Sequence, residues 1–87
     1  MRFSVPDVKR SDIAYSGQCI VIDSGCDYFG NGTPFATTVN SPSWSQLMKI
    51  ATQAQKVTGN QHHDFFEGID AIAVINDVPV FRLMLGS

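Results

Sequence analysis

One stretch of the sequence decides the fold: residues 68–85 read GIDAIAVINDVPVFRLML. Its two apolar runs have strand length, and Asn76-Asp77 between them fits a two-residue hairpin turn with positive φ at both positions. The turn sets the register of the two strands and places Val74 opposite Pro79. Because the N–H that Pro79 lacks then points away from the partner strand, we expect the last strand to lie at an edge of the sheet near Pro79.

This register also places apolar side chains on both faces of the hairpin. One face is expected to carry Ile72, Val74, Phe81, Leu83 and Leu85, and the other Ile69, Ala71, Ala73, Ile75, Val78, Val80 and Met84. A single helix covers only one face of a four-stranded sheet, so the other face needs a cover from the N-terminal arm or from a second copy of the chain. The sequence therefore favours a homodimer or a small homo-oligomer.

The range Pro42–Thr58 is predicted to form the helix of the domain. Ser41 can cap it ahead of the proline, and Ser43 with Gln46 offers an alternative capping box. Apolar side chains recur at helical spacing along one side, at Trp44, Leu47, Met48, Ala51 and Ala54. Gly59 follows the last turn, where a left-handed residue commonly ends a helix.

Two more strands are predicted before the helix. Gln18–Asp23 is a β-branched run, and Phe35–Val39 follows after a loop rich in Gly and Asn, so the two form a hairpin. Residues 1–16 form an N-terminal arm with at most a short extended piece at 13–15. This order predicts a single α+β domain over residues 1–87, with one antiparallel four-stranded sheet in ββαββ order and the helix on one face. The expected core is Ile20, Ile22, Trp44, Leu47, Met48, Ala51, Ile72, Val74, Phe81 and Leu83.

The composition excludes several classes of protein. The chain has 87 residues, with 6 Lys and Arg against 8 Asp and Glu, and its cations are scattered, so binding to nucleic acid through phosphates is disfavoured. Its first ten residues carry no apolar stretch typical of a secretory signal, and no run approaches the ~18 apolar residues of a membrane span. We therefore expect a cytoplasmic protein that binds neither nucleic acid nor membranes.

The chain offers few ligands for a metal ion. Cys19 and Cys26 are its only cysteines, and we expect them to be free thiols, the first in a strand and the second in a loop. The spaced oxygen ligands from Asp23 to Asn31 resemble a calcium loop, but Pro34 stands where the closing acidic residue belongs. No metal site and no cofactor are expected.

The densest polar cluster follows the helix, at His62-His63-Asp64 and Glu67. Imidazole titrates near neutrality and carboxylates orient or accept protons, so these residue types suit acid–base catalysis or a divalent metal. Neighbouring residues in extended chain point to opposite sides, so the two histidines do not easily reach one ion together. The alternative is structural: one histidine packs against Phe65 or Phe66 and the other caps helix carbonyls.

A family resemblance rests on the same motif. The segment Ala51–Lys56, followed by His62-His63, an aromatic pair and a strand, resembles the central helix and His-His motif of the pterin-4a-carbinolamine dehydratases. The order hairpin, helix, hairpin is also similar to that family's fold. The resemblance implies that His62 and His63 act on the hydroxyl of a pterin. The chain departs from the family pattern at Asp64, where the family has a small residue or proline.

The loop before the second strand carries Tyr28 and Phe29, flanked by glycines. Exposed aromatic side chains provide a large contact area at low entropic cost, so these two are candidates for a recognition patch. The alternative is that they fold back and cover the core.

Two hypotheses about function remain. The sequence favours a non-enzymatic domain that acts by self-association or by binding a protein partner. The alternative is a small dehydratase-like enzyme, with His62 and His63 as catalytic residues in a binding site that includes Asp64, Phe65, Phe66 and Glu67.

Overall fold

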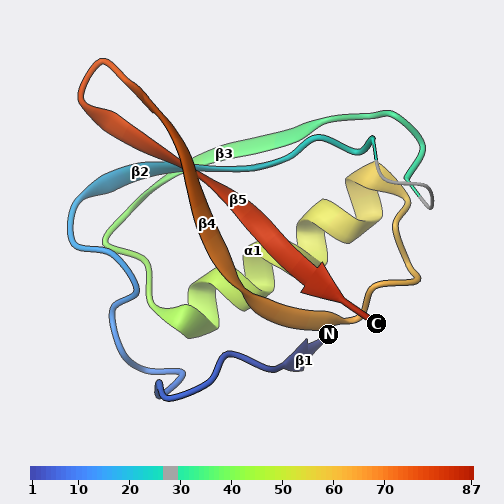
Figure 1. Ribbon diagram of the computed structural model, residues 1–87, viewed down its shortest axis with the longest axis horizontal. Helices are drawn as coiled ribbons and strands as arrows, with labels where there is room; N and C mark the ends of the chain where they lie inside the picture. Colours follow the sequence, from blue (N-terminus) through green and yellow to red (C-terminus); the bar gives the residue numbers. More distant parts are fainter. Residues whose placement is uncertain (27–29) are drawn as a thin grey trace.

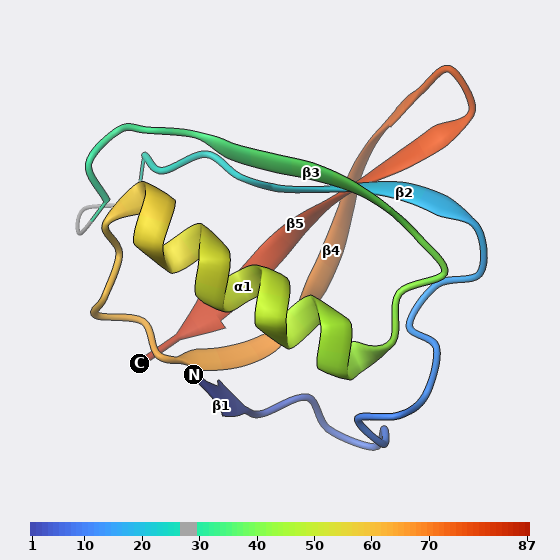
Figure 2. The same ribbon diagram turned by 180° about the vertical axis from the view of Figure 1, so that it is seen from behind.

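The computed structural model describes residues 1–26 and 30–87, which form an α+β domain with one helix and a five-stranded sheet. The elements in chain order are β1 (Arg2–Phe3), β2 (Gln18–Asp23), β3 (Phe35–Asn40), α1 (Trp44–Thr58), β4 (Phe65–Ile75) and β5 (Val78–Gly86). The sheet is strongly curled, like half of a barrel, and α1 lies in its hollow (Figures 1 and 2).

The sheet is mixed, with strand order β1-β4-β5-β2-β3, so the expectation of four antiparallel strands is wrong in two respects. Each hairpin is antiparallel as predicted, but the two hairpins meet through a parallel pairing of β2 with β5. In addition, β1 pairs in parallel with the start of β4. Pairing between strands that are distant in sequence leaves no local signal, whereas hairpins do.

β5 occupies the middle of the sheet, so the prediction that the last strand lies at an edge is wrong for most of its length and holds only around Pro79, where β2 does not pair with it. Its ladder with β2 begins at Val80 and ends at Arg82. Pro79 lies just outside that ladder, so its missing N–H removes no hydrogen bond of the parallel pairing.

The turn of the second hairpin is confirmed. Asn76 and Asp77 have φ of 50° and 66°, and the Cα pairs are Ile75 with Val78 and Val74 with Pro79. Before these pairs, at a greater distance from the turn, β4 contains one extra residue between Ala71 and Ala73.

This bulge at Ile72 changes which face the earlier residues of β4 occupy. Ala71 pairs with Phe81 and Ile69 with Leu83, so both lie on the helix side rather than on the opposite face where the regular register placed them. An inserted residue moves every residue that precedes it in β4 to the opposite face. The hydrophobic pattern of β4 gives no sign of the insertion, because both faces of the strand are apolar.

α1 is held at both ends by the residues expected there. Ser43 is the N-cap: Ser43 N donates to Gln46 Oε1 at 2.8 Å, and Gln46 N donates to Ser43 Oγ at 3.1 Å, which completes a capping box. Gly59 ends the helix in the left-handed region, with φ of 75°.

The helix begins two residues later than Pro42, the predicted first position. Ser41 is engaged elsewhere, since its N donates to Gly17 O at 2.8 Å and its Oγ accepts from Gly17 N at 2.9 Å. Pro42 is fully buried, and its carbonyl accepts from Ala14 N at 2.9 Å. Both residues thus join the N-terminal arm to the helix start.

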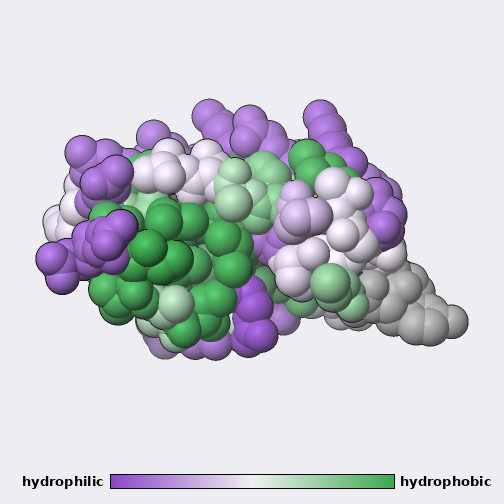
Figure 3. All heavy atoms as spheres, turned by 90° about the horizontal axis from the view of Figure 1, so that it is seen from above, coloured by the Kyte–Doolittle hydropathy of each residue, from purple (hydrophilic) through white to green (hydrophobic). Residues whose placement is uncertain are grey.

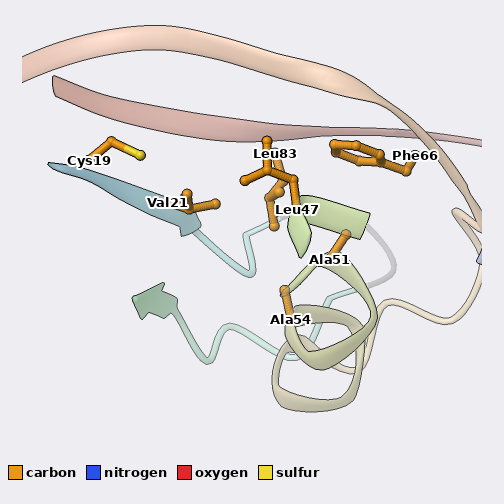
Figure 4. Close-up of a cluster of buried hydrophobic side chains, with 7 residues drawn as sticks. All are labelled: Cys19, Val21, Leu47, Ala51, Ala54, Phe66 and Leu83. Carbon is orange, nitrogen blue, oxygen red and sulfur yellow. The ribbon is translucent and has the colours of Figure 1, made fainter. Parts of the chain in front are cut away.

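The core lies between the curled sheet and α1 (Figure 4). Its buried members are Cys19, Val21, Leu47, Ala51, Ala54, Phe66 and Leu83. Of the predicted core, Leu47, Ala51 and Leu83 are buried, and Trp44, Met48 and Phe81 pack against the cluster.

Four predicted core residues lie elsewhere. β2 turns Cys19 and Val21 toward the helix, so Ile20 and Ile22 lie on the other face of the sheet and are only half-buried. Ile72 is 46% exposed and Val74 69% exposed, because the hairpin extends beyond the region that α1 covers (Figure 1).

The N-terminal arm closes one side of the core. Tyr15 packs edge-on to Phe81 with ring centroids 5.3 Å apart, and Phe3 packs on Phe66 at 6.2 Å. The arm also lies against the helix start, where Trp44 N donates to Asp12 O at 3.0 Å. It therefore fills the space beside α1 and leaves the exposed end of the second hairpin uncovered.

Candidate functional site

His63 is fixed by side chains around the end of α1. The buried Gln55 donates from Nε2 to His63 O at 2.7 Å. The buried Asn60 accepts from His63 N through Oδ1 at 3.4 Å, and its Nδ2 lies 3.0 Å from His63 Nδ1. Because the His63 N–H is bound to the amide oxygen of Asn60, the NH₂ group of Asn60 faces Nδ1 of the His63 ring.

The two histidines form an edge-to-face pair, with ring centroids 5.3 Å apart and planes 86° apart. His62 is exposed, whereas His63 is half-buried and lines a pocket. The pair is therefore close together, but the two rings have different surroundings.

The next two residues of the predicted cluster contact the N-terminal arm. The Asp64 carboxylate lies 3.1 Å from the amino group of Met1, and the Arg2 guanidinium lies 5.7 Å from the centroid of the Phe65 ring. Arg2 N also donates to Asp64 O at 2.8 Å. These residues hold β1 beside β4.

The last two predicted site residues also have structural positions. Phe66 is fully buried, with its ring centroid 6.2 Å from that of Trp44. Glu67 is exposed at the first irregularity of β4, and its carboxylate lies within 2.6 Å of the position that a Cβ on Gly86 would take. The structure thus distributes the predicted cluster over several contacts instead of gathering it around one hollow.

A pocket of about 400 Å³ lies beside His63, within the size range of small-molecule sites. Its lining is Asp23, Ser24, Cys26, Asn60, His63, Arg82, Leu83, Met84 and Leu85. Three separate segments build it: the turn after β2, the connection after α1, and the end of β5. Of these residues, the sequence placed only His63 in a candidate site, and it considered Asp23 only as a calcium ligand, because the parallel pairing of β2 with β5 that brings the segments together leaves no local signal.

The polar wall of the pocket is held by a tight turn. Gly25 N donates to Asp23 Oδ1 at 3.0 Å, and Cys26 N donates to Ser24 Oγ at 3.2 Å. Across the pocket, Arg82 pairs with the Asp70 carboxylate at 3.2 Å, with both side chains about half exposed. Opposite charges from Asp23 and Arg82 therefore line the same hollow.

Both cysteines are free thiols, as predicted. Cys26 is exposed on the pocket rim, whereas Cys19 is buried in the core, and burial raises the pKa of the Cys19 thiol. Within residues 1–26 and 30–87, no group of three or more His, Cys, Asp or Glu side chains is placed to hold a metal ion. Tyr28 and Phe29 lie outside the described residues.

The second surface of interest is the distal hairpin, residues 71–79, which projects beyond the helix-covered part of the sheet (Figures 1 and 2). Residues 71–75 are all exposed and all apolar, with Ile72 at 46%, Val74 at 69% and Ile75 at 54%. Figure 3 looks down on the end from which the hairpin projects and shows a broad hydrophobic area there.

The outer edge of β4 is open along the distal hairpin. β1 pairs with β4 only at Phe65 and Phe66, and within the described residues the rest of β4 has no strand on that side. An open edge next to uncharged apolar side chains is a template for pairing with another strand.

Comparisons with protein-family models, with curated proteins and with solved structures found no match to this chain. Within the part of the chain that the structure describes, no helix has the length and apolar character needed to cross a membrane.

Proposed function

We propose that the chain is a small association module that binds another protein chain through the distal hairpin. The observation that carries this proposal is the run of five exposed apolar residues, 71–75, on a hairpin that no other described element covers. Each Å² of apolar surface left in water costs about 25 cal/mol relative to burial. Contiguous exposed apolar surface of this kind marks interaction sites in soluble proteins.

The structural contacts made by the residues of the predicted polar cluster support a binding role over catalysis. Asp64 and Phe65 hold β1, and Phe66 is a core residue. These contacts account for the residue types around His62-His63 without any reaction.

A photo-crosslinking side chain placed at Val74 tests the proposal in cells. We expect a discrete protein adduct, either at twice the chain mass of 9.5 kDa or at the sum of the chain mass and the mass of a different partner. Ile13 is the matched control, because it is 55% exposed and apolar but lies in the N-terminal arm. An equal adduct yield from both positions, or none from position 74, contradicts the proposal.

A second candidate function is favoured by one observation, the pocket of about 400 Å³ that His63 lines. A small enzyme similar to the pterin-4a-carbinolamine dehydratases would use such a pocket to hold a pterin. The test is turnover of a 4a-hydroxytetrahydropterin by the wild-type chain and by His63→Ala, with circular dichroism as the control for folding. Loss of turnover in a folded variant supports this candidate, and a wild-type chain without turnover eliminates it.

A further inference from the structure

We propose that the open edge of β4 is occupied by the same edge of a second copy, so that two chains pair antiparallel through residues 71–74 across a twofold axis. This inference rests on the proposed association function and specifies its partner. It also specifies the contact, which is a strand ladder rather than the packing of two apolar faces.

The backbone of the distal hairpin presents suitable hydrogen-bonding groups at this edge. In a two-residue hairpin the residues that flank the turn form a hydrogen-bonded pair, so Ile75 directs its N–H and C=O toward Val78. Val74 therefore directs its backbone groups outward.

The bulge supplies a second outward residue three positions earlier. Ile72 and Ala73 both oppose Val80 on β5, as the two residues of a bulge do. Alternation then turns the backbone groups of Ala71 outward again. The edge thus offers two pairs of backbone groups, at Ala71 and Val74.

These two residues match each other in an antiparallel copy. Ala71 pairs with Val74 of the second copy and Val74 with its Ala71, around an axis between positions 72 and 73. The spacing of three residues is unusual for a ladder, but it is identical on both copies because both carry the same bulge. Such self-complementarity is what a twofold interface requires.

Charges select this arrangement over a parallel stack. In the antiparallel register, Asp70 faces Ile75 of the other copy and Asp77 faces its Gly68, so no like charges are opposed. A parallel in-register pairing would place each aspartate beside its own copy, which destabilises a sheet. The charges therefore favour the antiparallel register, and the contact closes as a dimer because each copy uses the same edge of β4.

The length of the open edge also fits a second copy. The turn of the partner hairpin ends opposite Gly68, and the residues that β1 covers on β4 are Phe65 and Phe66. The two strands β1 and the two hairpin turns therefore do not overlap. Across the ladder, Val74 meets Ala71 of the other copy and Ile72 meets its Ala73, so the exposed apolar side chains of Ile72 and Val74 lose part of their exposure.

Two substitutions at one position separate edge pairing from face packing. Val74→Pro removes the outward N–H, which makes no bond to β5, whereas Val74→Thr keeps the N–H and the shape of the side chain but adds a hydroxyl. By sedimentation equilibrium, we expect the proline to weaken the dimer at least about tenfold and the threonine less than about threefold. Equal weakening by both variants overturns the edge pairing.

Hydrogen exchange tests the same strand pairing in the wild-type chain, so its result does not depend on how a variant folds. The amides of Ala71 and Val74 are expected to be protected at high protein concentration and to lose protection on dilution, while the amide of Ala73, which faces β5, stays unchanged. A dimer without this protection, or a crosslinked adduct only with a different protein, overturns the inference and leaves the association function standing. A strictly monomeric chain with no adduct at position 74 overturns both.

Discussion

β4 and β5 pass through two regions of the molecule that resemble each other in sequence and differ in environment. In the helix-covered region, Phe66 is fully buried and Leu83 is 5% exposed. In the distal hairpin, Val74 and Ile75 are equally apolar, yet they are 69% and 54% exposed. The difference arises from the reach of α1 and the N-terminal arm, which end before the hairpin does (Figure 2). Hydrophobicity alone therefore identifies a strand that must be covered, and the topology decides whether the chain itself covers it.

The sharpest test of this comparison replaces one large apolar residue in each region. Phe66→Ala should lower the free energy of unfolding by about 3–5 kcal/mol, because it leaves a cavity among Phe3, Trp44 and the core. Val74→Ala should cost less than about 0.5 kcal/mol in the monomer. Urea unfolding at low protein concentration measures both, and comparable losses would mean that the distal hairpin is packed in the monomer.

The distal hairpin also differs from the turn after β2 in the surroundings of its left-handed residues. Gly25 has φ of 69°, and a Cβ added there would lie 2.2 Å from the carbonyl oxygen of Thr33, so Gly25→Ala should cost about 2–3 kcal/mol. Asn76 and Asp77 have similar φ values, but both are exposed at the hairpin tip. The matched substitution Asn76→Ala should cost about 1 kcal/mol or less by the same measurement. An equal cost at both sites would show that conformation alone, and not the neighbouring chain, requires the glycine.

The helix-covered region packs against α1, so a weakened N-terminus of the helix should destabilise this region. Ser43→Ala removes the acceptor for Gln46 N and should lower the free energy of unfolding by about 1 kcal/mol. Ser45→Ala is the control, because no side-chain bond to the capping box involves it. Native-state hydrogen exchange should show faster exchange in the first turn of α1 and no change in the distal hairpin. A change in the exchange rates of the distal hairpin amides would mean that the two regions unfold together.

The sequence predicts the local features of this fold well. The turn at Asn76-Asp77, the capping box at Ser43 and the left-handed Gly59 each depend on a few neighbouring residues, and each is found in the structure. The β2–β3 hairpin depends on the same kind of signal.

The features that escaped prediction all involve distant parts of the chain. The side-by-side pairing of β2 with β5 and the addition of β1 have no short-range signature, and they determine both the order of the sheet and the lining of the pocket. The bulge at Ile72 is hidden because both faces of β4 are apolar. In β2 the alternation itself is clear, but Cys19 and Val21 are as apolar as Ile20 and Ile22, so the pattern does not say which pair is buried.

The smallest expected effect concerns the turn of the distal hairpin. Asp77 has φ of 66°, a region that aspartate occupies at some cost and glycine occupies freely, and Asn-Gly is the favoured pair for this turn. Glycine also increases the entropy of the unfolded chain, so the net gain from Asp77→Gly should be only a few tenths of a kcal/mol. Because the distal hairpin has little contact with the core, this gain should slow exchange of the Ile75 and Val78 amides while the urea midpoint of the whole domain stays unchanged. A shift of the global midpoint by the full amount would instead mean that the hairpin and the helix-covered region form one cooperative unit, and that the contrast between them is one of exposure and not of stability.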